Sequence, residues 1–188
     1  MKTKNEIRDE MRRLRRQLGA EERAEMSEAI CRAVLGRADV QAALAARRPF
    51  AVYLATPEEI DLTTLVEALW AADVTVAIPC WDAARKCYVL GAYDNMTTLV
   101  EGYMHIPEPA ELNEIAPVDV GVWIVPGLAF TRDGARLGYG GGWYDRLLRA
   151  AAPDAAKLGV AYPFQIVPGL PVELHDQDLT DVVTLAED

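Results

Sequence analysis

The chain has 188 residues, of which 51% are hydrophobic and 26% charged, which is typical of one globular domain. Its formal net charge of −10 argues against nonspecific nucleic-acid binding, which requires a basic surface. An acidic protein that binds an anion must concentrate cations and backbone N–H groups in one place.

Cysteine spacing and hydropathy exclude further classes of protein. The cysteines are Cys31, Cys80 and Cys87, and without C-x-x-C spacing they predict neither a disulfide framework nor a zinc knuckle. No apolar run approaches the roughly 18 residues that span a bilayer, and no signal-peptide pattern is present. We therefore expect a cytoplasmic protein without nucleic-acid or membrane partners, and we expect a monomer because no long apolar stripe is left exposed.

Two helices are predicted at the start of the chain. One apolar face has the i, i+4, i+7, i+11 spacing of a helix: Ile7, Met11, Leu14 and Leu18. Thr3 and Glu6 suit a capping box at the start of this helix. The same segment carries a cluster of cations: Lys2, Lys4, Arg8, Arg12, Arg13, Arg15 and Arg16. A second helix is predicted from Ala20 to about Leu35.

After residue 48 the spacing of the apolar residues changes from one typical of helices to one typical of strands. Residues 49–54 form a short apolar run, which is typical of a buried strand. Asp61 is expected to cap a helix whose apolar residues are Leu62, Leu65, Val66 and Leu69. Residues 74–78 predict a second strand, which Pro79 is expected to end.

The second half continues the alternation of strands and helices. Residues 88–92 predict an antiparallel or edge strand, and the prolines in the stretch 95–117 predict a region rich in loops. Residues 118–125 give the strongest strand pattern, and two more strands are predicted, at 157–161 and 182–185.

Strands that alternate with helices imply βαβ units and a largely parallel sheet covered on both faces. We therefore predict an α/β fold, a three-layer αβα domain with a mostly parallel sheet. The domain is expected to span residues 1–188, with N-terminal helices over 4–35 and an α/β core over 49–188.

A glycine-rich loop lies between the strongest strand and a helix predicted over 143–151. Four of the five residues 138–142 are glycine, and glycines before a helix let backbone N–H groups bind an anion. Arg136 can donate two hydrogen bonds to a phosphate, and Asp145 is a carboxylate of the kind that binds Mg²⁺ beside phosphates. The loop is neither a Walker A loop nor a dinucleotide fingerprint, because G-K-[ST] is absent and Trp143 replaces the third glycine. The glycines alone would suit a flexible turn equally well.

Residues 134–145, Gly-x-Arg-Leu-Gly-Tyr-Gly-Gly-Gly-Trp-Tyr-Asp, resemble the signature of the 5-formyltetrahydrofolate cyclo-ligases. Other segments agree with that family in order and spacing: 4–8, 59–61, 106–109, and 171–176 ahead of 182–184. Three positions depart from the common pattern. Trp143 replaces Tyr or Phe, Cys80 replaces a basic residue, and Thr180 replaces an acid.

The resemblance implies an ATP-dependent cyclisation of 5-formyltetrahydrofolate to 5,10-methenyltetrahydrofolate, with release of ADP and phosphate. In that reaction the formyl oxygen is phosphorylated and N10 then attacks. The resemblance also implies a sheet like that of the sugar-phosphate isomerases and CoA transferases, a catalytic role for Arg136 and Tyr144, and Mg²⁺ bound by Asp145 and Asp176.

Binding residues follow from the same resemblance. The ATP-binding set is Lys4, Asn5, Glu6, Ile7, Arg8, Arg136, Leu137, Gly138, Tyr139, Gly140, Gly141, Gly142, Trp143 and Tyr144. The folate-binding set is Leu54, Glu59, Tyr139, Trp143 and Tyr144. His105 and His175 are given no role.

From the residues alone, two other functions stay open. One is a small-molecule kinase with an atypical phosphate loop, and the other is a noncatalytic folate- or nucleotide-binding regulator. Each site residue also has a structural alternative. Lys4 and Arg8 fit a solvated helix face, Glu59 fits a helix cap, and Asp145 fits the first turn of a helix.

Overall fold

The structure is a computed structural model that describes residues 2–186. Its central feature is a seven-stranded sheet in the order β11-β10-β7-β1-β2-β3-β6. The bounds of these strands are β1 (Phe50–Ala51), β2 (Val76–Asp82), β3 (Cys87–Tyr93), β6 (Glu114–Ile115), β7 (Val122–Val125), β10 (Ala156–Val160) and β11 (Asp181–Val183). The pairs from β11 to β2 are parallel, whereas β3 is antiparallel to both β2 and β6.

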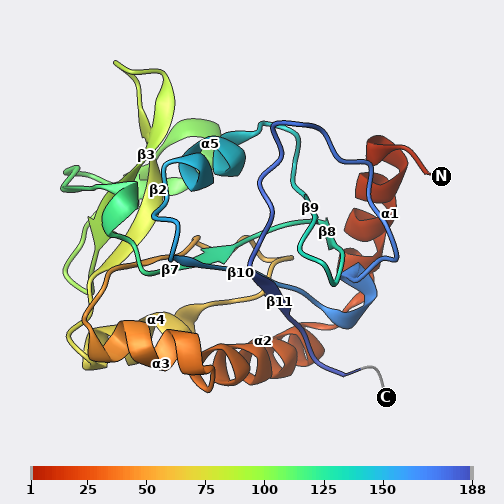
Figure 1. Cartoon of the computed structure of the whole chain (residues 1–188), viewed down its shortest axis with the longest axis horizontal. Helices are drawn as coiled ribbons and strands as arrows, with labels where there is room; N and C mark the ends of the chain where they lie inside the picture. The colour runs from red at the N-terminus through yellow and green to blue at the C-terminus, as the bar shows by residue number, and fades with distance from the viewer. Residues whose placement is uncertain (1, 187–188) are drawn as a thin grey trace.

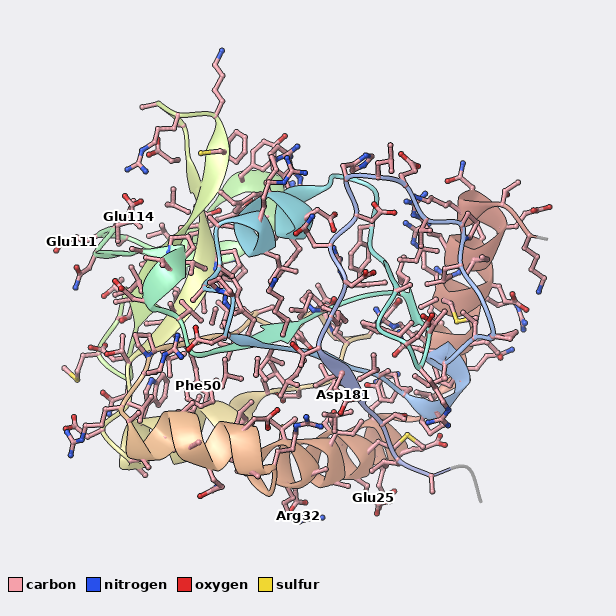
Figure 2. All side chains as sticks on the ribbon, in the orientation of Figure 1. Glu25, Arg32, Phe50, Glu111, Glu114 and Asp181 are labelled. Atoms are coloured by element: carbon pink, nitrogen blue, oxygen red, sulfur yellow. The ribbon has the colours of Figure 1, made fainter. Side chains whose placement is uncertain are left out.

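Helices cover both faces of the sheet (Figure 1). One face carries α2 (Ala20–Leu35), α3 (Ala38–Ala45) and α4 (Thr63–Ala71), and the other carries α5 (Trp143–Arg149). Phe50 of β1 points into the layer between the sheet and α3, whereas Glu25 and Arg32 point from α2 away from the sheet (Figure 2). The predicted three-layer αβα fold with a mostly parallel sheet is confirmed.

Helix α1 (Lys4–Gln17) lies at one end of the sheet, beside the short hairpin of β8 (Ala129–Phe130) and β9 (Arg136–Leu137) (Figure 1). Its apolar face contributes to a small core of its own, which contains Ile7, Met11, Leu128 and Leu137. This packing brings the first helix against the segment that leads into the glycine loop.

The remaining elements are short. A second hairpin pairs β4 (Leu99–Glu101) with β5 (Pro107–Pro109) across the 3₁₀ turn η1 (Tyr103–His105). Two more 3₁₀ turns are η2 (Pro117–Asp119) and η3 (Pro163–Gln165). None of the helices described is long and apolar enough to cross a membrane.

The start of α1 has the predicted capping box. The Thr3 hydroxyl accepts a hydrogen bond from the Glu6 amide at 3.3 Å, and the Glu6 carboxylate accepts one from the Thr3 amide at 2.7 Å. The helix therefore begins at Lys4, and the two cations Lys4 and Arg8 lie one turn apart. The predicted bounds of α2 are also confirmed.

Strand bounds were predicted less well. The run 49–54 contributes only Phe50–Ala51 to the ladder. Pro79 does not end β2, which continues to Asp82. The Val52 amide bonds to the Ala77 carbonyl, so the next parallel bond would need an amide at position 79, which proline lacks. Pro79 thus ends the pairing with β1, while β2 continues along β3.

Other differences have local causes. Residues 118–121 precede β7 rather than belong to it, because Pro117 starts a 3₁₀ turn. The stretch 95–117 contains β4, β5 and β6, and helix α3 was not predicted. Asp61 lies one residue before the cap position of α4, but its carboxylate still accepts the Thr63 amide at 2.9 Å.

We expect Thr3→Ala to lower the free energy of unfolding by about 1 kcal/mol, because it leaves an amide of the first turn without its acceptor. The measurement is urea denaturation of the purified protein. The control is Thr64→Ala on the exposed surface of α4, where alanine is a better helix former and stability should be kept. Equal stability of Thr3→Ala and the wild type would show that the capping box does not hold α1.

Candidate active site

A cavity of about 1060 Å³ lies at the carboxyl end of the parallel strands, where open α/β sheets bind ligands. Its walls come from the segment after β1, from the end of β7, from α1 and from the glycine loop with α5. Most of the predicted site residues line it: Lys4, Arg8, Leu54, Glu59, Arg136, Leu137, Gly138, Tyr139, Gly140, Gly141, Gly142, Trp143, Tyr144, Asp145 and Asp176.

Three predicted ATP-binding residues lie outside this lining. Ile7 is buried in the core beneath α1, Glu6 belongs to the capping box, and Asn5 accepts a hydrogen bond from Arg8 at 2.8 Å. Asn5 thus orients a cavity residue instead of lining the cavity.

The glycine loop needs backbone conformations that favour glycine. Gly140 has φ of 108°, and Gly142, the residue before α5, has φ of 63°. The loop is tied to the first helix, because the Arg8 Nε donates to the Gly138 carbonyl at 3.0 Å. The helix α1 and the glycine loop therefore lie together in the wall of the cavity.

Arg136 lies against the base of α5. Its guanidinium donates to the Asp145 Oδ1 at 2.8 Å, and the two side chains are only 5% and 13% exposed. The same carboxylate oxygen accepts the Gln177 amide at 3.2 Å. The Arg136 Nε is buried and has no hydrogen-bond partner among residues 2–186. An unpaired donor beside a glycine loop is what a phosphate oxygen would satisfy.

Tyr144 lies beneath the guanidinium of Arg136, whose central carbon is 5.7 Å from the ring centroid. Its hydroxyl is buried and lacks a partner within the described chain. Burial, with a smaller contribution from the Glu59 charge, raises the pKa of Tyr144 far above its ordinary value. The group therefore stays a neutral hydroxyl that can donate a hydrogen bond to a ligand.

Glu59 lies across the cavity and is 8% exposed. One carboxylate oxygen accepts the amide and hydroxyl of Thr56, both at 3.0 Å. The other accepts the Tyr139 hydroxyl at 2.8 Å, and that hydroxyl accepts from Arg15 at 2.8 Å. Glu59 is thus held through its side chain instead of capping the helix that follows.

Lys4 reaches two acids at the cavity rim. Its Nζ lies 2.8 Å from the Glu173 Oε1 and 3.2 Å from the Asp176 Oδ2. Burial acts to lower the pKa of Lys4, but hydrogen bonds to Glu173 and Asp176 outweigh it and raise that pKa. Burial acts to raise the pKa of Asp176, and the Glu173 amide and Lys4 outweigh it and lower that pKa.

An aromatic cluster walls the side of the cavity nearest β2 and β3. The ring of Trp143 makes edge contacts with Trp81 and Tyr88, with centroids 5.2 and 5.3 Å apart, and Tyr103 stacks on Trp81 at 4.4 Å. The guanidinium of Arg146 covers Trp143 at 4.1 Å. Trp143 therefore joins a larger apolar wall that can hold a planar ring.

Sequence reasoning missed several residues of this site: Arg15, Thr56, Trp81, Tyr88, Tyr103 and Arg146. Trp81 and Tyr88 are cross-strand partners in the β2–β3 ladder, so recognising that hairpin would have brought them together. Arg15 lies four residues after Met11 and eight after Ile7, which places it on the buried face of α1.

The residues fit a magnesium ion that is shared with phosphates. No cluster of three or more metal-ligating side chains is found in residues 2–186, so a cage made by the protein alone is not available there. The hydrogen bonds to Asp145 go to Oδ1, and those to Asp176 go to Oδ2. The Oδ2 of Asp145 is therefore left for a cation that takes its other ligands from phosphates and water, whereas the Oδ1 of Asp176 has the His175 Nε2 3.8 Å away.

Comparison with known proteins gives one family. Residues 1–185 match the 5-formyltetrahydrofolate cyclo-ligase family. A 5-formyltetrahydrofolate cyclo-ligase of Haemophilus influenzae is 28% identical over 184 residues, 96% of each chain. One of Escherichia coli K12 is 35% identical over 140 residues, 71% of this chain and 76% of that one. The NMR structure of Aquifex aeolicus 5,10-methenyltetrahydrofolate synthetase has a TM-score of 0.82 at 31% identity, covering 96% of this chain and 89% of that one.

The lowered pKa of Asp176 gives a pH prediction. A carboxyl group with a depressed pKa stabilises the fold above its unfolded pKa and loses that effect as pH falls through its folded pKa. Asp176→Asn should therefore lower the free energy of unfolding by up to about 1 kcal/mol at pH 7, and the difference should narrow below about pH 4. Urea denaturation at several pH values measures this, with the exposed Asp178→Asn as control. A difference that stays constant with pH would contradict the assigned hydrogen bonds.

Proposed function

The chain belongs to the 5-formyltetrahydrofolate cyclo-ligase family, and we propose that its cavity holds MgATP and 5-formyltetrahydrofolate side by side. The chain is accordingly an ATP-dependent ligase that converts 5-formyltetrahydrofolate to 5,10-methenyltetrahydrofolate. Family membership decides against the kinase and the noncatalytic regulator.

One observation carries the assignment of the two substrates to this cavity. Arg136 and the glycine loop line one wall of the cavity, while the buried carboxylate of Glu59 lies on another. Donors for phosphate oxygens and an acceptor for the N–H groups of a pterin therefore face a single space. That arrangement suits a reaction in which a phosphoryl group passes to the folate itself.

The chemistry requires activation of a poor leaving group. In the proposed first step the formyl oxygen attacks the γ-phosphorus, the bond to the bridging oxygen breaks, and ADP leaves. In the second step N10 attacks the formyl carbon, the C–O bond breaks, and inorganic phosphate leaves as N10 loses its proton. The enzyme contributes positioning and charge stabilisation to both steps.

Each residue is assigned a role in that sequence. Lys4 and Arg8 bind phosphates from α1, and Arg136 stabilises charge on the phosphoryl group during transfer. The Tyr144 hydroxyl, which burial keeps neutral, donates a hydrogen bond to the same group. Glu59 accepts hydrogen bonds from the pterin, whose ring packs against the aromatic wall of Trp143.

Mg²⁺, where bound, neutralises phosphate charge. We assign its protein ligands to Asp145 and Asp176. The Arg136–Asp145 pair then holds the metal-binding carboxylate and the phosphate-binding guanidinium in one fixed relation.

We also propose a cytoplasmic monomer without nucleic-acid or membrane partners. A net charge of −10 supports the exclusion of nucleic acid. Free cysteines support a reducing compartment, and burial raises the pKa of both Cys31 and Cys80 to about 11, which keeps them as unreactive thiols.

An absorbance assay with 5-formyltetrahydrofolate, ATP and Mg²⁺ tests the reaction, because the methenyl product has a near-ultraviolet chromophore. We expect the chromophore to grow only when ATP and Mg²⁺ are both present, with one ADP formed for each product molecule. ADP formation without the chromophore would overturn the proposed function.

Arg136→Lys tests the phosphate-binding role without leaving Asp145 unpaired. Lysine keeps a cation but loses the planar pair of donors, so turnover should fall by about 100-fold while the thermal midpoint changes little. The control Arg132→Ala removes an exposed arginine from the same segment and should behave as wild type. Wild-type turnover in Arg136→Lys would remove this residue from the reaction.

A further inference from the structure

Arg15 is a buried cation on the apolar face of α1. The buried residues of that helix are Ile7, Met11 and Arg15, and Arg15 is only 3% exposed. A charge taken out of water is unfavourable unless hydrogen bonds and opposite charge compensate it. What Arg15 contacts therefore indicates why the chain keeps it at this position.

The guanidinium of Arg15 contacts the glycine-loop side of the cavity. It donates to the Tyr139 hydroxyl at 2.8 Å and to the Gly127 carbonyl at 2.5 Å, while its Nε has no partner among the residues described. Within residues 2–186 no carboxylate forms a salt bridge with it. The opposite charge that it reaches is that of Glu59, through the hydroxyl of Tyr139.

The direction of this hydrogen-bond chain is fixed by chemistry. Arginine only donates, so the Tyr139 oxygen accepts from Arg15 and its single proton points to the Glu59 Oε1. Tyr139 is 51% exposed as a whole, but desolvation of its hydroxyl, followed by the charge of Glu59, raises the pKa of Tyr139 well above its ordinary value, so that proton stays in place. Because Thr56 donates to the other oxygen of Glu59, both oxygens of this carboxylate are held by hydrogen bonds.

Tyr139 connects the two halves of the cavity. It lies between Gly138 and Gly140 in the loop assigned to phosphate, yet its hydroxyl ends on the carboxylate assigned to the pterin. We propose that Arg15 is a positioning residue that acts through the Tyr139 hydroxyl to hold the glycine loop and Glu59 in one fixed geometry. This inference rests on the proposed function of the cavity.

Stability alone does not account for Arg15. The direct partners of Arg15 are the neutral Tyr139 hydroxyl and the Gly127 carbonyl, which also accepts from the Gln165 Nε2 at 3.0 Å. Arg15→Met therefore breaks no direct ion pair, and it also removes the unpaired Nε. A positioning role therefore predicts that substrate binding and fold stability respond differently to this substitution, and a purely structural role does not predict this. Substrate binding should weaken in this variant while the fold keeps its stability.

The experiment compares Arg15→Met, Tyr139→Phe and the double variant with wild type, using KM for both substrates, kcat and the thermal midpoint. Each single variant should raise KM for 5-formyltetrahydrofolate about tenfold, with a smaller change in kcat and an unchanged thermal midpoint. Because both residues act through one hydrogen-bond chain, KM in the double variant should be no higher than in the more impaired of the two single variants. The control Arg13→Met makes the same change on the exposed face of α1 and should match wild type.

Wild-type KM values in Arg15→Met or Tyr139→Phe would overturn the inference and leave the proposed function intact. So would a double variant whose loss equals the product of the two single losses, or a fall in thermal midpoint that parallels the loss of activity. A wild-type protein that forms no methenyl product would overturn the proposed function, and the inference with it.

Discussion

Electrostatics sets the main constraint on this protein, because a chain of net charge −10 has to bind the phosphates of ATP. The solution is local concentration of positive charge. Helix α1 and the glycine loop lie side by side, joined by the hydrogen bond from Arg8 to the Gly138 carbonyl. Lys4 of α1 and Arg136 of β9 are two further cations that line the cavity. The capping box at Thr3 and the small core beneath α1 matter because they hold these cations in place.

Three cations at or near the cavity are each linked to a carboxylate. Arg136 is paired with Asp145, Lys4 with Asp176, and Arg15 with Glu59 through Tyr139. Each pair couples a group assigned to phosphate or to the loop with a carboxylate assigned to the metal or the pterin. The cavity is therefore preorganised by charge pairs along its walls, which is the arrangement expected when catalysis depends on positioning.

Local patterns explain what could be predicted from the sequence. The helix α1, its capping box and the glycine loop each depend on spacing within a few residues, the parallel sheet follows from the alternation of strands and helices along the chain, and all are present. The aromatic wall was not predicted, because the strand expected to end at Pro79 left out Trp81, which pairs with Tyr88 in the β2–β3 ladder, and Tyr103 joins them only through the turn η1. The spacing of Arg15 from Ile7 and Met11 places it on the apolar face of α1, but its contacts with Tyr139 and Gly127 join segments far apart in the sequence and could not be predicted from it.

The proposed reaction depends on direct passage of a phosphoryl group to the folate held in the same cavity. Substrate labelled with oxygen-18 in the formyl group tests it, with the mass of the released inorganic phosphate as the readout. Each phosphate should carry the labelled oxygen, because the formyl C–O bond breaks only after that oxygen is phosphorylated. Unlabelled phosphate, with the label in water, would contradict it and would mean that ATP hydrolysis and ring closure are separate events.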